Sequence, residues 1–430
     1  MSATRSGPVT FGQLSVIRSL AVHGPERQAV ANLVSVWEVP PGIGTAAVMD
    51  AWLRLVEAHE SLRTTYDSPG ERPVQIVHPF RPSRIPTVEL AEDTSAAAQR
   101  ATAEWAREPI SIDTGPPWRA FVAEHQGDPL WFCTVIHHVA ADNGALRILE
   151  AQFHELLAGR APAAADQPLD MALAQLADPA RIRQGVAHWT EVWDRLVPSD
   201  RDPTDTSERR RASLYSTAAL ASARELSQRL RISVQSVLLA IGALALSRLE
   251  GREQLTFALM AANRLGGPWA SVVGSLNQYA PVTVTVDERT HPLKFLQDLY
   301  VQSLTAYLNG CYDVDVLKRS LREAGCRDED PTAFAKHFNF LGEVDAEPEP
   351  RSLLRTGVEW RGSAQRSGPN FHLATAVGTG LLIGVGASRH CLADDAPALL
   401  AASIEAGIVN LAEGAHDSLR NLRLDPIRAV

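Results

Sequence analysis

Helix and strand signals follow one another along the whole chain, but they do not alternate strictly. Residues 32–39 have strand character and residues 44–62 have helical periodicity, whereas two strand-like stretches, 254–261 and 280–286, precede the helix predicted at 292–308. A mixed order of this kind favours sandwich lobes of the α+β class. The chain has 430 residues, which is too long for a single ordinary core. We therefore expect two lobes of roughly 150–250 residues each.

The stretch "RAPAAADQPLD" (160–170) is rich in Ala and Pro and is the candidate linker between the lobes. It predicts a first lobe over residues 1–165 and a second over residues 166–430. No internal repeat or long low-complexity tract interrupts either half.

The charge balance argues against a nucleic-acid binder. The chain carries 41 Lys+Arg against 50 Asp+Glu, a formal net charge of −9, whereas nucleic-acid-binding domains usually show a basic face. One basic cluster, Arg209 to Arg211, occurs in "RDPTDTSERRRAS" (201–213) and is predicted to lie in an exposed, solvated loop. The alternative is a contact with an acidic partner or a phosphate.

Cysteine usage and the apolar segments favour a cytoplasmic protein without a membrane partner. None of the four cysteines (Cys133, Cys311, Cys326 and Cys391) forms a C-x-x-C pair, so no structural zinc site is indicated and reduced thiols are expected. The N-terminus lacks the continuous apolar core of a secretory signal. The apolar stretch 232–247 is too short to span a bilayer and is predicted to be a buried helix.

The stretch "VIHHVAADNG" (135–144) is the candidate site. A hairpin with its turn at 127–129 is predicted to bring an apolar strand to its end at His137 and His138, and an amphipathic helix follows with Asp142 or Asn143 as N-cap. Because successive strand residues point to opposite faces, only one histidine can face a cleft. We expect His138 to do so and His137 to point back into the lobe.

A neutral imidazole at a cleft can accept a proton near pH 7, so His138 is the first candidate catalytic group, and His137 and Asp142 complete the candidate catalytic set. The alternative is that both histidines are a satisfied pair in the core. No third ligand falls at helical spacing near them, so a metal site is not predicted. No G-x-S-x-G elbow is present for a serine nucleophile.

The stretch "HHVAAD" resembles the His-His-x-x-x-Asp-Gly signature of the condensation domains of nonribosomal peptide synthetases, which belong to the chloramphenicol acetyltransferase-like superfamily. Other family blocks follow in the family's order over nearly the whole chain. The stretches of this chain that resemble them are "FGQLSVIRSL" (11–20), "EAHESLRTTY" (57–66), "IDTGPPWRAFV" (112–122), "ANRLGGPWASVVGSLNQYAPV" (262–282) and "HFNFLGE" (337–343).

The resemblance implies two acetyltransferase-like α/β sandwich lobes in a V-shaped pseudo-dimer, with His138 at the centre of a tunnel between them. A donor acyl group would enter as a thioester on the phosphopantetheine arm of a carrier protein, and an amine or hydroxyl acceptor, free or carrier-bound, would enter from the other face. The chain itself would bind no cofactor. His138 would deprotonate the acceptor, or else position it or stabilise the tetrahedral intermediate. Asp142 would be structural, paired with Arg264 of the "NR" block.

The chain departs from the family pattern at three places. Asn143 stands where the family has Gly, with Gly144 one place later, although Asn tolerates the left-handed region better than most residues. In the stretch 262–282, Asn277-Gln278 stands where the family usually has Asn-Thr. The family's "YxDYAxW" block is only partly matched by the residues around Trp189. These changes leave the fold expectation unaltered and leave the substrate class open.

Three functions follow from the resemblance. The first is a free-standing acyltransferase that meets its carrier in trans, since no adenylation or carrier segment is visible. The second is a non-catalytic module that recruits partner enzymes or carriers. The third, minor one is epimerisation, because "FNFLG" (338–342) resembles the epimerisation domains, although their Glu-Gly-His-Gly-type block is not found.

Other residues carry two interpretations each. Arg63 is predicted to be an ion-pair partner that supports the fold, with tunnel lining as the alternative. Asn339 and His372 could face the tunnel from the second lobe, although strand-core packing is also consistent with their positions. Asn277 is a further candidate for the tunnel lining. Trp360, in the Gly/Ser-rich stretch 357–371, either crosses between the lobes or lies in a plain surface loop.

Overall fold

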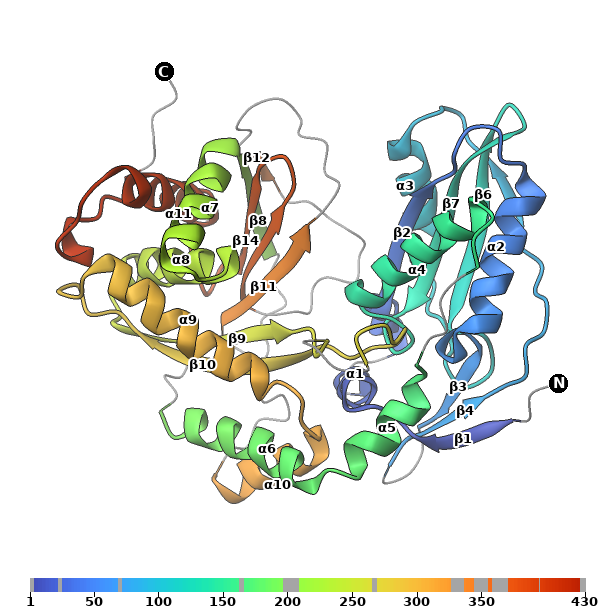
Figure 1. Cartoon of the computed structure of the whole chain (residues 1–430), viewed down its shortest axis with the longest axis horizontal. Helices are drawn as coiled ribbons and strands as arrows, with labels where there is room; N and C mark the ends of the chain where they lie inside the picture. The colour runs from blue at the N-terminus through green and yellow to red at the C-terminus, as the bar shows by residue number, and fades with distance from the viewer. Residues whose placement is uncertain are drawn as a thin grey trace.

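The computed structural model describes residues 4–21, 25–68, 72–161, 166–195, 209–264, 269–325, 336–343, 355–357, 370–393 and 395–425. Two α/β lobes are joined at one end and spread apart at the other, like a V (Figure 1). This arrangement confirms the predicted fold class. The split at residues 165 and 166 stays a prediction, because residues 162–165 lie outside the described ranges.

The first lobe contains two sheets, ordered β2-β7-β6-β5 and β1-β4-β3. Its elements are β1 (Arg5–Pro8), α1 (Phe11–Ala21), a 3-10 helix (Pro25–Ala31), β2 (Asn32–Glu38), α2 (Thr45–Ala58), a second 3-10 helix (Glu60–Arg63), β3 (Thr64–Asp67), β4 (Val74–Val77), β5 (Thr87–Glu89), α3 (Ser95–Trp105), β6 (Trp118–His125), β7 (Asp128–His137) and α4 (Asn143–Leu157).

Aromatic side chains fill the core of the first lobe between the larger sheet and helices α2 and α4. The ring of Trp37 on β2 lies 5.9 Å from Trp52 on α2 and 5.3 Å from Phe153 on α4, centroid to centroid. Each of these side chains is at most 2% exposed. The tilted contacts of these rings hold helices α2 and α4 against the sheet that contains β7.

The hairpin of β6 and β7 turns one residue earlier than the sequence predicts. Gln126 and Gly127 both have positive φ, 54° and 86°, as the two central residues of a type I′ turn require. Asp128 and Pro129 already belong to β7. Glycine at the second position suits this backbone, whereas the glutamine gives no sequence signal for it.

The second lobe contains one seven-stranded sheet, ordered β10-β9-β11-β13-β14-β8-β12. Its elements are β8 (Arg209–Ser216), α7 (Thr217–Leu230), α8 (Val234–Glu250), β9 (Gln254–Ala261), β10 (Gln278–Thr285), α9 (Pro292–Leu308), β11 (Lys336–Glu343), β12 (Arg355–Gly357), β13 (Phe371–Val377), β14 (Leu381–Ser388), α11 (Ala396–Glu413) and a 3-10 helix (Leu419–Asn421). Helices α7, α8, α9 and α11 cover one face, and the other face is turned toward the first lobe (Figure 1).

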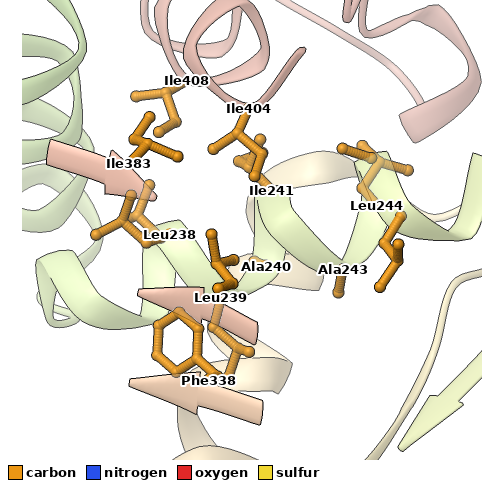
Figure 2. Close-up of a cluster of buried hydrophobic side chains, with 14 of the residues drawn as sticks. Leu238, Leu239, Ala240, Ile241, Ala243, Leu244, Phe338, Ile383, Ile404 and Ile408 are labelled. Atoms are coloured by element: carbon orange, nitrogen blue, oxygen red, sulfur yellow. The ribbon is translucent and has the colours of Figure 1, made fainter. Parts of the chain in front are cut away.

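Helix α8 is apolar all round and is buried, as its composition predicts. Figure 2 shows Leu239 beside Phe338 of β11, and Ile241 beside Ile404 of α11. Ser233 caps the first turn of α8, and Gly251 ends the helix with φ 65°. Within the described ranges, α11 alone and the pair α7–α8, bent by 109°, are long and apolar enough to cross a membrane. Because these helices form the centre of the second lobe's core, we interpret them as core helices.

The basic cluster predicted to be a loop is a strand. Arg209, Arg210 and Arg211 open β8, which pairs along its length with β14. The other half of β8 alternates Ala212 and Leu214, both buried, with partly exposed residues. This period of two was hidden in the sequence because arginine occupies three successive positions. Residues 201–208 lie outside the described ranges.

Three helices lie at the joined end of the lobes (Figure 1): α5 (Pro168–Leu176), α6 (Pro179–Trp193) and α10 (Val314–Glu323). The ring of Trp189 on α6 stands edge-on to Tyr312 at 5.5 Å, and both residues belong to the core of the first lobe. Arg18 of α1 binds both carboxylate oxygens of Asp315 on α10 at 2.8 Å. Side chains from α6 and α10, which follow the first lobe in the chain, therefore complete its core.

Candidate active site

Strand β7 ends at His137, between β2 and the start of β6, and the two histidines diverge there. The backbone N–H of His137 donates to Pro117, and that of His138 donates to the carbonyl of Ala31 at 2.7 Å. His137 is 3% exposed, whereas His138 is half-buried. The structure thus places the rings as strand alternation predicts, with His137 turned into the lobe.

His137 is held as a neutral ring. The backbone N–H of Val139 donates to its Nδ1 at 3.1 Å, so that nitrogen carries no proton and Nε2 does. Burial, together with a smaller effect of the neighbouring His138, lowers the pKa of His137 to about 3. A group that stays neutral down to this pH does not exchange protons near pH 7.

His138 is oriented by two oxygen atoms at its Nδ1. Nδ1 lies 3.0 Å from the carbonyl oxygen of Ala141 and 3.4 Å from Oγ of Ser275. A carbonyl oxygen can only accept, so Nδ1 carries the proton, and in the neutral ring Nε2 keeps the lone pair. The Ser275 hydroxyl donates in turn to Oδ1 of Asn277 at 3.4 Å.

Asp142 links the two lobes and begins α4. Its Oδ1 accepts from the backbone N–H of Ala145 at 2.8 Å as an N-cap and from Nη2 of Arg264 at 2.7 Å. Its Oδ2 accepts from the backbone N–H of Leu276 at 2.9 Å. The side chain is 3% exposed. The predicted pairing of Asp142 with Arg264 is therefore present. These three donors provide hydrogen bonds to a carboxylate whose burial would otherwise cost free energy.

Arg264 is held by its own loop as well as by Asp142. Its Nη1 donates to the carbonyl of Val272 at 2.7 Å, and Nη2 also donates to that of Gly274 at 3.1 Å. The preceding Asn263 has a left-handed backbone, φ 54°, and its amide donates to the carbonyls of Leu276 and Gly310. Asn263 and Arg264 together hold the 272–277 loop in place, so that Ser275 of this loop lies beside His138.

Asn143 and Gly144 do not form the left-handed turn that the resemblance to the family pattern left open. Asn143 is the first residue of α4 and is exposed. A Cβ on Gly144 would lie 2.4 Å from Nε of Arg264, closer than real contacts allow. Glycine is thus required at position 144 for the approach of Arg264, and Asn143 occupies an ordinary helical position.

The remaining candidates divide into three groups. Asn277 belongs to the site, since its backbone N–H reaches Oδ2 of Asp142 at 3.3 Å. Asn339 and His372 are half-buried on β11 and β13, on the face of the second sheet that is turned toward the first lobe. Trp360 lies outside the described residues.

Arg63 lies away from these groups. Its Nη1 donates to the carbonyl of His78 at 2.6 Å, and Nη2 approaches Glu60 at 3.9 Å. These contacts agree with the ion-pair interpretation and not with support of the site around Asp142.

Ser275 and the carbonyl of Ala141 were missed by sequence reasoning. Nothing in "VVGSLNQ" distinguishes this serine, and a carbonyl has no side-chain signature. In the part of the chain that the structure describes, no cluster of three or more His, Cys, Asp or Glu is placed to hold a metal ion. A groove of about 410 Å³ opens between α6 and α10, lined by Arg183, Val186, Val316 and neighbouring residues, and includes none of the predicted site residues.

Comparison with known families adds a match over most of the chain. Residues 25–371 match the model of the family described as "Condensation domain". Chondramide synthase of Chondromyces crocatus is 26% identical over 264 residues, which is 56% of this chain and 7% of that protein. The chain thus spans only a small part of this much longer relative.

Solved structures share the fold at low sequence identity. The condensation domain of monacolin K polyketide synthase superposes with a TM-score of 0.78 at 15% identity, covering 98% of this chain and 100% of that one. The epimerization domain from the third module of tyrocidine synthetase B superposes with a TM-score of 0.74 at 16% identity, covering 95% of this chain and 98% of that one. At this identity the likeness establishes the two-lobed fold.

Proposed function

This chain belongs to the condensation-domain family, and from that premise we propose that it transfers an acyl or aminoacyl group from a carrier-protein thioester to an amine or hydroxyl acceptor. Condensation domains are generally acyltransferase-like enzymes that work with carrier-bound substrates. The donor thioester on a phosphopantetheine arm and the acceptor are both substrates here. That the carrier is a separate protein, met in trans, stays a prediction.

The reaction needs no nucleophile from the protein. The acceptor heteroatom attacks the thioester carbonyl, a new C–N or C–O bond forms, and the C–S bond breaks. The proton lost by the acceptor ends on the carrier thiol, so atoms and charge balance. One base that takes this proton and returns it to the departing sulfur suffices.

The observation that carries the proposal is the orientation of His138. Nδ1–H is fixed on the carbonyl of Ala141, which leaves Nε2 as the ring nitrogen able to accept a proton or a hydrogen bond from the acceptor. Both roles considered for His138, general base and positioning group, use this same nitrogen. His137 is excluded from either role by its burial.

Asp142 and Arg264 act as positioning residues in this proposal. Their ion pair holds the start of α4 and the 272–277 loop together, so the Ala141 carbonyl and Ser275 stay at Nδ1 of His138. Losing the pair would misplace the imidazole without removing it. Small displacements of a catalytic group cost large rate factors.

The test is intact-mass spectrometry of carrier proteins from the same gene neighbourhood, each loaded with its acyl group. Each is incubated with this protein and a panel of amines and alcohols. We expect one carrier to lose its acyl mass in the presence of an acceptor, with the matching amide or ester appearing. The His138→Ala variant should lose this activity, and His78→Ala, an exposed histidine of the first lobe, should keep it. Transfer that is equal in His138→Ala and wild type would refute the proposed mechanism.

Two other functions have distinct outcomes in the same experiment. Stable binding of a carrier or enzyme with no mass change on any substrate would indicate a recruiting module. Uptake of deuterium from the solvent at the α-carbon of an aminoacyl carrier, without transfer and dependent on His138, would indicate epimerisation. Either outcome would replace the acyltransferase proposal.

A further inference from the structure

Helix α1 lies between the two lobes at their joined end (Figure 1), and it begins with a capping box. The backbone N–H of Gln13 donates to Oγ1 of Thr10 at 3.2 Å, and the backbone N–H of Thr10 donates to Oε1 of Gln13 at 2.9 Å. A Thr and a Gln three residues later satisfy two backbone donors at a helix start in this way. Both residues are 0% exposed, so the polar hydrogens that the box leaves over must find partners within the protein.

Thr10 uses its hydroxyl hydrogen to bind the loop beside His138. Its Oγ1 donates to the carbonyl of Ser275 at 3.1 Å, and the Ser275 hydroxyl lies 3.4 Å from Nδ1 of His138. Gly12 permits this approach, because a Cβ there would lie 2.4 Å from the carbonyl oxygen of Ser275. The start of α1 is therefore packed directly against the 272–277 loop.

Gln13 uses its side-chain amide to bind a tyrosine beneath the other loop. Its Nε2 donates to Oη of Tyr66 on β3 at 3.1 Å. Tyr66 is 0% exposed, and burial raises the pKa of its hydroxyl, so this group keeps its proton at pH 7. The hydroxyl lies 3.5 Å from the carbonyl of Val139, a long hydrogen bond, and Val139 directly follows His138.

Both loops beside His138 are therefore held by one set of side chains. We call this set the α1 network: Thr10, Gln13 and Tyr66. One loop carries the Ala141 carbonyl, 3.0 Å from Nδ1 of His138, and the other carries the second oxygen at this nitrogen. The ion pair described above joins these loops at the start of α4, and the α1 network joins them a second time at the start of α1.

A cap that served α1 alone would need neither of these further contacts. The box satisfies backbone donors within the helix, but its hydroxyl and amide hydrogens are directed to Ser275 and Tyr66. In the part of the chain that the structure describes, no side-chain N or O of Thr10, Gln13 or Tyr66 is buried without a partner. A fully paired buried network of neutral groups favours one arrangement of the segments that it joins.

We propose that the α1 network positions His138: it keeps Nδ1–H of that ring on the Ala141 carbonyl, so that Nε2 stays the accepting nitrogen. This inference rests on the proposed function, because it adds positioning residues to that reaction. If the loops moved apart, Nδ1 would lose its fixed acceptor and the ring would exchange between its two neutral tautomers. Nε2 would then carry the proton for part of the time and could not accept one from the substrate.

The first test reads the tautomer of His138 and needs no turnover. The full chain is labelled with ¹⁵N-histidine, the ring nitrogens are followed by NMR at neutral pH, and His138→Gln assigns the signals. We expect Nδ1 of His138 to be protonated in the wild type and to become partly unprotonated in Tyr66→Phe and Thr10→Val, which each remove one hydroxyl. Thr10→Ser, which keeps the hydroxyl, should give the wild-type signals.

Two matched controls remove the same chemical groups elsewhere. Tyr307→Phe removes a hydroxyl that also accepts from a glutamine amide, that of Gln235, between α8 and α9. Thr94→Val removes the hydroxyl that caps α3, where it accepts from the backbone N–H of Ala97 at 3.2 Å. Both controls should leave the His138 signals and acyl transfer as in the wild type. Urea unfolding of each variant separates an effect on His138 from a general loss of stability.

The second test is acyl transfer by the same proteins. Tyr66→Phe and Thr10→Val should lower kcat about tenfold or more, because small displacements of a catalytic group cost large rate factors. KM for the acceptor should stay close to the wild-type value, since the proposed role of the network is to orient His138 and not to bind substrate. Thr10→Ser should restore kcat.

An unprotonated Nδ1 of His138 in the wild type, or wild-type signals in both Tyr66→Phe and Thr10→Val, would overturn the proposal. Equal changes in the two controls, or a wild-type kcat in both network variants, would also overturn it. Circular dichroism checks each fold, and Gln13→Met replaces a network variant that does not fold. If the wild type transfers no acyl group, the proposed function fails while the NMR test still decides whether the network holds the tautomer. The two failures are therefore distinguishable.

Discussion

His137 and His138 are neighbours in the chain, yet their imidazoles carry the proton on different nitrogens. Nδ1 of His137 accepts from the backbone N–H of Val139, whereas Nδ1 of His138 donates to the carbonyl of Ala141. One ring is thereby fixed with Nδ1 as an acceptor, and the other with Nδ1 as a donor. The end of β7 therefore holds two adjacent imidazoles in opposite tautomers, as the proposed role of His138 requires.

The two tautomers are observable. We expect ¹⁵N NMR at neutral pH to show Nδ1 of His137 in its unprotonated form and Nδ1 of His138 in its protonated form. Substitution of each histidine by glutamine assigns the signals. The same tautomer at both positions would contradict the hydrogen bonds described here.

The burial of His137 makes stability depend on pH in a defined window. In the unfolded chain this ring takes up a proton near pH 6.5, whereas in the folded protein its pKa is about 3. Between these values the unfolded state binds more protons, so the free energy of unfolding falls as the pH falls. From pH 7 to pH 5 the loss due to His137 should be about 2 kcal/mol.

The measurement is urea unfolding at pH 5 and pH 7 for the wild type and for His137→Asn, whose Oδ1 can replace Nδ1 as acceptor without titrating. The variant should lose about 2 kcal/mol less than the wild type over this interval. Burial also lowers the pKa of His372, but that contribution is common to both proteins and cancels in the difference. If the unfolding free energies of the wild type and of His137→Asn fell by the same amount from pH 7 to pH 5, His137 would not be a buried, neutral ring.

The pair of Asp142 and Arg264 should be strongly coupled. Asp142→Asn keeps an oxygen to cap α4 but leaves the Arg264 guanidinium, 12% exposed, without its counter-ion. Each single variant, Asp142→Asn or Arg264→Gln, should lose about 3 kcal/mol or more of unfolding free energy. The double variant should lose less than the sum of the two.

Urea unfolding of the wild type, the two single variants and the double variant forms a double-mutant cycle. The coupling energy between Asp142 and Arg264 from this cycle is expected to be about 1–3 kcal/mol. The pair of Arg18 and Asp315 is the comparison, because its side chains are 23% and 25% exposed. Asp315→Asn should cost about 1 kcal/mol or less. Additive losses at Asp142 and Arg264 would show that the ion pair does not hold the loop.

Gly144 should not tolerate alanine, although alanine is the better helix former. In an open helix this change is favourable by about 1 kcal/mol, but here the new Cβ would lie 2.4 Å from Nε of Arg264. We expect Gly144→Ala to lower both the melting temperature and acyl transfer. Asn143→Gly, at an exposed position, should lower stability by about 1 kcal/mol or less and leave transfer close to the wild-type level.

Gly115→Ala is the control for these two variants, since nothing lies within 4 Å of a Cβ at that position. If Gly144→Ala were as stable and active as Gly115→Ala, the close approach of Arg264 would not constrain this position.

Much of the site was predictable because its signals are local. An apolar strand that ends in polar residues before an amphipathic helix predicts the end of β7, and Asp142 is a good N-cap by residue type. The partner Arg264 lies 122 residues away, and only the resemblance to a family indicated the pairing. Ser275 carried no signal, because its approach to His138 depends on how the 272–277 loop folds against the other lobe.

Arg211 shows a different limit of sequence reasoning. Three successive arginines predict solvent exposure, and this led to the wrong prediction of a loop at the start of β8. Whether an arginine faces solvent or a neighbouring lobe depends on the register of β8 against β14, in which Ala212 and Leu214 lie opposite Val385 and Ile383, and Arg211 lies opposite Gly386. Long-range pairing of this kind has no local signature.

The helices α6 and α10, which complete the core of the first lobe, have a consequence for biosynthesis. Trp189, Tyr312 and Leu317 pack into that core, but Tyr312 and Leu317 leave the ribosome long after α4 (Asn143–Leu157). At about 5–20 residues per second, the first lobe waits roughly 10–30 s with part of its apolar interior uncovered. During this interval the nascent chain is a natural client for chaperones, and a protein cut after residue 161 would keep that uncovered surface permanently.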